Sequence, residues 1–137
     1  MRKYLPTIAE LADRLSIVTL KSIKLKNKEE YEQEAKLIIH DLDELMKTKT
    51  IKNWGHFIRA IQIGAIANEI IWQNETLARE GGRNQDHLLP FTHSVNSVRM
   101  HAGNVIASQL GERKDLNLDR LSDEVTKQRG YNFGSIF

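Results

Sequence analysis

The sequence predicts an all-α protein, a four-to-five-helix up-and-down bundle with a long central buried helix. Apolar residues recur at helical spacing in four long segments, only two prolines occur, and no run of alternating apolar and polar residues indicates a strand. With 137 residues, 40% of them hydrophobic and 28% charged, the composition is typical of a folded globular protein. We therefore expect a single domain over residues 1–137.

The first two helices are predicted from capping residues and apolar stripes. Thr7 followed by Glu10 has the pattern of a capping box, and the apolar residues after it predict a helix over about 8–26. Asn27 followed by Glu30 repeats the pattern and opens a second helix with one apolar stripe and an opposite charged face. We expect this second helix to be amphipathic and half exposed.

The third and fourth helices fill the middle of the chain. The segment from about Trp54 to Glu80 is apolar nearly all the way round, which predicts the central, buried helix. Pro90 is expected to open a fourth helix that continues to about Leu110, because proline is tolerated in the first turn of a helix. A short helix is expected around residues 116–128, and residues 129–137 form an apolar end that we interpret as an oligomerisation tail.

Composition also limits the compartment and the partners. The chain has no cysteine, so disulfides and thiolate metal sites are excluded, and no segment is apolar and long enough for a signal peptide or a membrane span. We expect a cytoplasmic protein with no membrane partner. The formal charge of +2 gives no reason to expect nucleic acid as a partner.

A candidate ligand site lies on one face of the central helix. That face begins with Trp54, Phe57, Ile61 and Ala65 and continues with Asn68, Trp72, Glu75 and Arg79. The spacing places the last four within about 60° of one another, so an apolar face becomes polar in its second half. The alternative is that Glu75 and Arg79 form an ordinary surface pair. Asn68 favours a functional reading, because a buried amide must find hydrogen-bond partners.

Polar residues on two other helices extend this hypothesis. The fourth helix carries His93, Asn96, Arg99 and Asn104 away from its valines, where they could close over the central stripe or form a solvated outer face. On the first helix Asp13 and Arg14 interrupt an apolar region, so one of them is expected to be partly buried in a salt bridge.

Enzyme signatures are mostly missing. The histidines show no HExxH spacing, and the chain has no P-loop, GxGxxG motif or nucleophile motif, so we predict no catalytic residue, no metal site and no cofactor. An all-α magnesium-dependent nucleotide pyrophosphohydrolase stays open as an alternative. Its acidic pairs would have to come from Glu29, Glu32, Asp41 and Glu44, which also suit a solvated helix face.

Four segments carry a resemblance: ELADRLSIVTLK, IIWQNETLAREG, THSVNSVR and GERKD. Together they resemble a group of small uncharacterised helical proteins encoded by tailed bacteriophages, over the stretch from Glu10 to Asp115. The resemblance supplies no activity. It implies a phage context, in which small helical proteins act as inhibitors, assembly factors or sequestering proteins.

The function expected from these observations is non-enzymatic binding of a small anionic, nucleotide-like ligand by a homo-oligomer, in a phage context sequestering an immune signalling nucleotide. Trp72 would stack on a base, Arg79 and Arg99 would hold phosphates, and the asparagines would read polar edges. A protein-binding inhibitor or assembly factor that uses the second helix and the tail is the alternative from another class.

Overall fold

The computed structural model describes residues 5–79 and 85–112, and these contain four α-helices and no strand. The helices are α1 (Ile8–Lys24), α2 (Lys28–Met46), α3 (Trp54–Arg79) and α4 (Gln85–Leu110). The all-α prediction is confirmed. The predicted short helix at 116–128 and the predicted tail at 129–137 lie outside the described residues.

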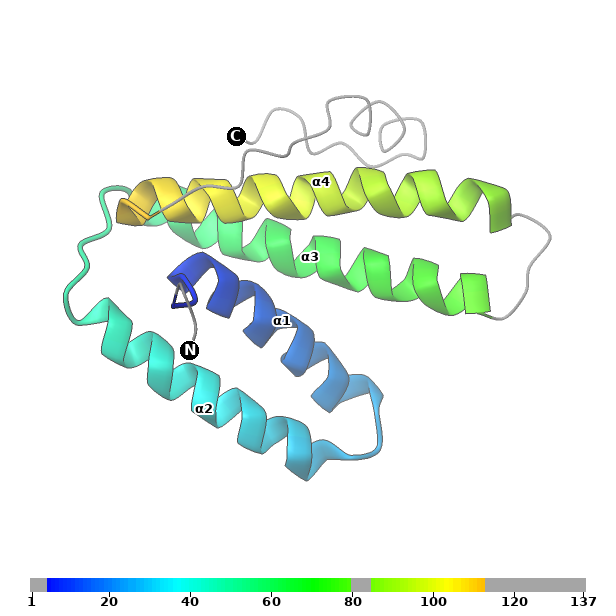
Figure 1. Cartoon of the computed structure of the whole chain (residues 1–137), viewed down its shortest axis with the longest axis horizontal. Coiled ribbons are helices and arrows are strands. Elements are labelled where there is room, and N and C mark those ends of the chain that lie inside the picture. The colour runs from blue at the N-terminus through cyan, green and yellow to red at the C-terminus, as the bar shows by residue number, and fades with distance from the viewer. Residues whose placement is uncertain (1–4, 80–84, 113–137) are drawn as a thin grey trace.

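The four helices form two hairpins (Figure 1). α3 and α4 are a long, closely packed antiparallel pair, and α1 and α2 form a second, shorter pair. α1 lies against both α3 and α4, whereas α2 packs closely on α1 alone among the described helices. The second hairpin is therefore attached to the first mainly through α1, and α2 stands at the edge of the bundle.

Apolar side chains are buried in three clusters along the bundle. At one end, Ile8 at the start of α1, Phe57 at the start of α3 and Leu110 at the end of α4 meet in one cluster. Further along, α3 and α4 bury a second cluster that includes Ala67 and Val95, both fully buried. A third cluster joins α1 to α2. Burial of this apolar surface is the main force holding the helices together.

The start of α1 is fixed by two side chains. Thr7 Oγ1 accepts a hydrogen bond of 3.1 Å from the Glu10 backbone N–H, which confirms the predicted cap. The Glu112 carboxylate, just past the end of α4, accepts from the Ile8 N–H at 3.0 and 3.1 Å and from the Ala9 N–H at 3.4 Å. A carboxylate at this position also complements the positive end of the helix dipole. The beginning of α1 and the end of α4 are thereby tied together.

The starts of the other helices differ from the prediction. Asn27 precedes α2 but makes no side-chain capping bond, so the second predicted cap was wrong. Asn53 does cap a helix: its Oδ1 accepts from the His56 N–H at 3.3 Å at the start of α3. α4 begins at Gln85, so Pro90 does not open it and that prediction was wrong as well. Pro90 therefore lies in the second turn of α4, where its missing N–H removes one backbone hydrogen bond.

α3 is buried along one side of its length only. Its residues facing α4 and α1 are buried, but Trp54, Ile58 and Ile61 are 59%, 49% and 38% exposed. The apolar pattern around α3 predicts burial on all sides. Only one side of α3 is covered by other described helices, because α2 packs on α1 rather than on α3. None of the described helices combines the length and apolar character needed to cross a membrane.

Candidate functional site

The eight residues predicted to line a ligand site are divided among three places. Asn68, Asn96 and Arg99 meet around Asp13 of α1. Glu75 and Arg79 form a pair near the C-terminal end of α3. Of the remaining three, His93 is exposed, and Trp72 and Asn104 are half-buried.

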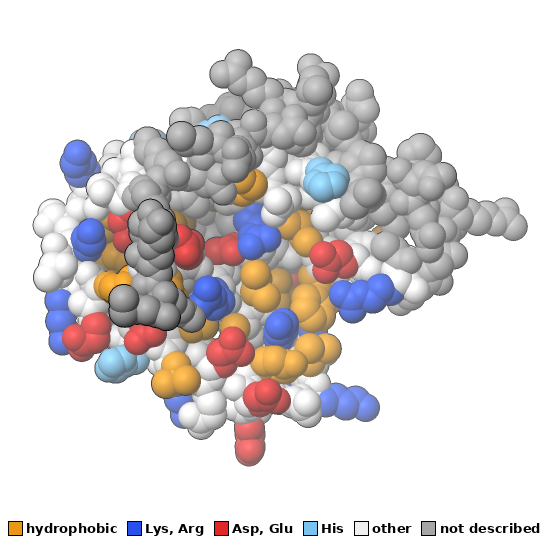
Figure 2. Space-filling model, viewed as in Figure 1, with side chains coloured by type: hydrophobic (Ala, Val, Ile, Leu, Met, Phe, Trp, Pro, Cys, Tyr) orange, Lys and Arg blue, Asp and Glu red, His pale blue; other side chains and the backbone are white. Residues whose placement is uncertain are grey.

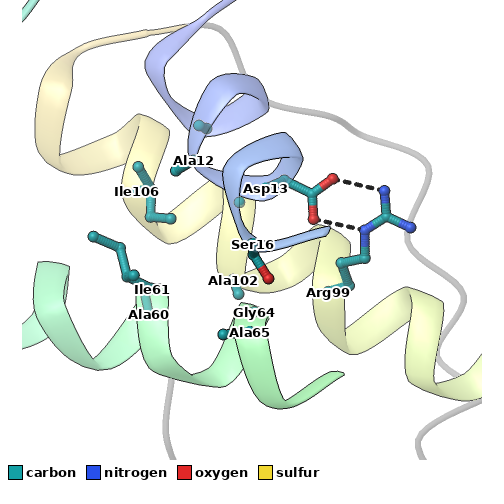
Figure 3. A pocket seen from close by; sticks show the side chains of 12 residues that line it. Ala12, Asp13, Ser16, Ala60, Ile61, Gly64, Ala65, Arg99, Ala102 and Ile106 are labelled. Carbon is teal, nitrogen blue, oxygen red and sulfur yellow. Dashed lines mark hydrogen bonds and ion pairs between the residues drawn. The ribbon is translucent and has the colours of Figure 1, made fainter. Parts of the chain in front are cut away.

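The polar cluster centred on Asp13 joins α1, α3 and α4, and Figure 3 shows its pair of Asp13 and Arg99. Arg99 Nε donates to Asp13 Oδ1 at 2.8 Å, and Arg99 Nη2 donates to Asp13 Oδ2 at 2.6 Å. Asn68 Nδ2 donates to Asp13 Oδ1 at 3.0 Å and to Ser16 Oγ at 3.1 Å, while Arg99 Nη1 donates to Asn96 Oδ1 at 3.2 Å. Two predictions are confirmed here: Asp13 is partly buried in a salt bridge, and the buried amide of Asn68 has found partners.

The polar side chains of this cluster are hydrogen-bonded to one another without a ligand. The bidentate contact with Asp13 is the strongest arrangement open to a guanidinium group. A phosphate that bound Arg99 would therefore have to displace the Asp13 carboxylate, which is also negatively charged. The cavity beside the pair measures about 20 Å³, enough for one water molecule. We conclude that Asp13 and Arg99 hold α1 against α4, and that the small cavity lined by this pair cannot hold a nucleotide.

The second half of the α3 stripe is more exposed. Glu75 Oε2 and Arg79 Nη2 are 3.6 Å apart, and their side chains are 51% and 77% exposed, as in the surface pair considered from the sequence. Sequence reasoning missed Asn74, which is buried and donates to Thr92 of α4. Asn74 continues the 4-3-4 spacing of the buried residues at 63, 67 and 70, and that spacing could have identified it.

No metal centre is found in the described part of the chain. Nowhere in residues 5–79 and 85–112 do three histidine, aspartate or glutamate side chains come close enough to hold an ion. The acidic residues of α2, which a magnesium-dependent hydrolase would need, belong to a largely exposed helix. Among the described residues there is therefore no three-ligand site for a metal ion that would activate water on a phosphate.

A second hollow lies between α1, α2 and α3, and sequence reasoning missed it. Its volume is about 500 Å³. Apart from Ser16 and Thr19 of α1, the described residues that line it are apolar. The larger of them come from all three helices: Ile8, Leu15, Leu20, Leu42, Met46, Phe57 and Ile61. We call this hollow the apolar groove.

The apolar groove is long and opens beside an exposed apolar ridge. It follows α1 from Ile8 to Leu20, which at 1.5 Å per residue is about 18 Å, or three helical turns. Trp54 and Ile58 of α3 are exposed next to it, and Trp54 contacts the ring of Phe57 edge-on at 5.8 Å between centroids. An exposed apolar patch beside a groove marks an interaction site more often than a free surface. On the face of the molecule seen in Figure 1, the space-filling view of Figure 2 shows hydrophobic side chains among charged side chains of both signs.

The chain matches no protein-family model, and comparison with curated proteins and with solved structures also gives no match. The fold and the two sites define a small helical-bundle protein with an interhelical polar cluster and an open apolar groove.

Proposed function

We propose that the protein is a non-enzymatic interaction protein that binds an amphipathic helix of a protein partner in the apolar groove. The observation that carries the proposal is the groove itself, a hollow of about 500 Å³ that lies open between α1, α2 and α3 and is lined mainly by apolar side chains. Leaving that much apolar surface in water is unfavourable, so an occupant stabilises the fold as it binds.

The shape of the groove favours a helix over a small molecule. Its volume alone would suit either, because small-molecule pockets range over about 300–1,000 Å³. A small molecule inside the groove would leave the neighbouring Trp54 and Ile58 in water. A helix of about three turns laid along α1 would cover the groove and this ridge together, which is the helix-in-groove mode of recognition.

This proposal corresponds to the protein-binding inhibitor or assembly factor considered from the sequence, with the surface moved to the groove from the outer face of α2 and the tail. The phage context, the homo-oligomer and the cytoplasmic location stay predictions. Binding of a nucleotide-like ligand also stays a prediction. Of the two arginines predicted to hold its phosphates, Arg99 is already paired with Asp13, whereas the side chain of Arg79 is largely exposed to solvent.

A photo-crosslinking experiment with a matched control tests the groove. The photoreactive residue p-benzoylphenylalanine replaces Ile61, which lines the groove, or Ile66, which is 52% exposed on the same helix but about 140° further round. After irradiation in the producing cells, position 61 should form an adduct with one polypeptide species, identified by intact mass and peptide mapping, and position 66 should not. Absence of a polypeptide adduct at 61, or equal yields at both positions, would contradict the proposal.

A further inference from the structure

We infer that the helix in the apolar groove is α3 of a second copy of this chain, so that the groove and its ridge form the interface of a symmetric dimer. The inference rests on the proposed function and names the partner of the same groove. In the dimer the two α3 helices pack antiparallel across a two-fold axis, and the ridge of each copy enters the groove of the other.

The exposed ridge consists of four residues of α3 whose spacing is that of the contact seam between two packed helices. Trp54, Ile58, Ile61 and Ala65 follow one another at intervals of four, three and four residues, the repeat by which two helices interlock their side chains. Trp54, Ile58 and Ile61 are exposed and Ala65 is half-buried. The next residue of the repeat, Asn68, is already held by Asp13, so the apolar seam ends there.

The face is complementary to itself, as a two-fold interface requires. The ridge from Trp54 to Ala65 is about 16 Å long and the groove along α1 is about 18 Å long. Ile61 and Ala65 belong to both the seam and the groove wall, so ridge and groove lie side by side on α3. In an antiparallel pairing the large Trp54 lies opposite the small Ala65 of the partner subunit, and Ile58 lies opposite Ile61 of the partner subunit.

The distribution of charge agrees with a buried interface. Among the fifteen residues from 54 to 68 the sole formal charge is Arg59, which is about 140° round the helix from Trp54 and so faces away from the seam. Depletion of charge is characteristic of interface cores. Just beyond the end of the seam, Glu69 is paired with Lys24 in an ion pair of 3.0 Å.

Single cysteines test this interface directly, because the natural chain has none. Ile61→Cys places one thiol per chain close to the inferred two-fold axis, and Ile66→Cys places one on the far side of the same helix. With copper phenanthroline or a short bismaleimide, the purified Ile61→Cys protein should give a covalent dimer that involves this position, whereas Ile66→Cys should stay monomeric on a denaturing gel. Equal linking of both variants, or none at position 61, would overturn the inference.

Sedimentation velocity of the full chain supplies the second measurement. Wild type and Ile66→Glu should have twice the 15.8 kDa of the chain, whereas Ile61→Glu should raise the dimer dissociation constant at least about 100-fold, because it buries an unpaired charge. Circular dichroism verifies that Ile61→Glu is helical, and Ile58→Glu serves the same purpose if it is not. A dimer that survives both changes would overturn the inference.

The outcomes separate this inference from the proposed function. A monomeric wild type whose position 61 photo-crosslinks to a different polypeptide overturns the second copy as occupant and leaves the helix-binding groove standing. A monomeric wild type whose position 61 crosslinks to no polypeptide, or to residues 113–137 of its own chain, overturns both.

Discussion

Removing the Asp13 carboxylate should destabilise the fold more than its position near the surface indicates. Asp13→Ala deletes the acceptor of two hydrogen bonds from Arg99 and one from Asn68. Breaking a fully buried pair costs about 3–5 kcal/mol and breaking an exposed one at most about 1 kcal/mol. The Asp13 and Arg99 side chains are 29% and 31% exposed, which places them between these limits. We expect the free energy of unfolding to fall by about 2–3 kcal/mol.

Thermal and urea unfolding followed by circular dichroism measure this loss, which for a chain of this size lowers Tm by roughly 10 °C. Glu75→Ala, which breaks the exposed pair with Arg79, is the control and should cost less than about 0.5 kcal/mol. Arg99→Ala should cost less in the Asp13→Ala background than alone, with a coupling of about 1–2 kcal/mol. If Asp13→Ala costs no more than Glu75→Ala, or the two cluster variants are additive, the Asp13 cluster does not hold the helices together.

Three further predictions concern other parts of the chain. Glu112→Gln should lower the free energy of unfolding in urea by about 1 kcal/mol, because it removes the negative charge that caps the Ile8 N–H at the start of α1; an unchanged value would show that this cap adds nothing. Gly103→Ala should raise the same quantity by about 0.5–1 kcal/mol, because nothing lies within 4 Å of an added Cβ and alanine favours a helix; a decrease would show that packing there is tighter than the structure indicates. If native mass spectrometry with a nucleotide panel detects a bound nucleotide, Arg79→Ala should weaken that binding by about 1.5–3 kcal/mol in calorimetric titration without changing Tm, and unchanged affinity would remove this arginine from the site.

The sequence predicted what local spacing determines. The positions of the four helices follow from apolar periodicity, and the Thr7 cap needs only its neighbour three residues on. Asn27 shows the limit, because the same residue pattern there makes no capping bond. A cap depends on the backbone path into the helix as well as on the residue that supplies it.

The site was predicted in part, for a related reason. Burial of a polar group implies a partner, and this logic identified Asn68 and Asp13 as residues that must be bonded. It could not show that Arg99, 86 residues along the chain from Asp13, would be that partner rather than a phosphate ligand. The apolar groove escaped prediction because apolar residues all round α3 indicate burial without showing which neighbour provides it.

The bond between Glu112 and the start of α1 has a consequence for the order in which the protein forms during synthesis. Each hairpin can form from neighbouring segments, and such local contacts form quickly. The contacts that join the hairpins are distant in sequence. Asp13 cannot form its salt bridge before Arg99 is synthesised, and the Ile8 N–H cannot form its hydrogen bond before Glu112, 104 residues later, is synthesised. Of the four described helices α1 is therefore the first to be synthesised, yet its bond to Glu112 can form only after the other three are complete.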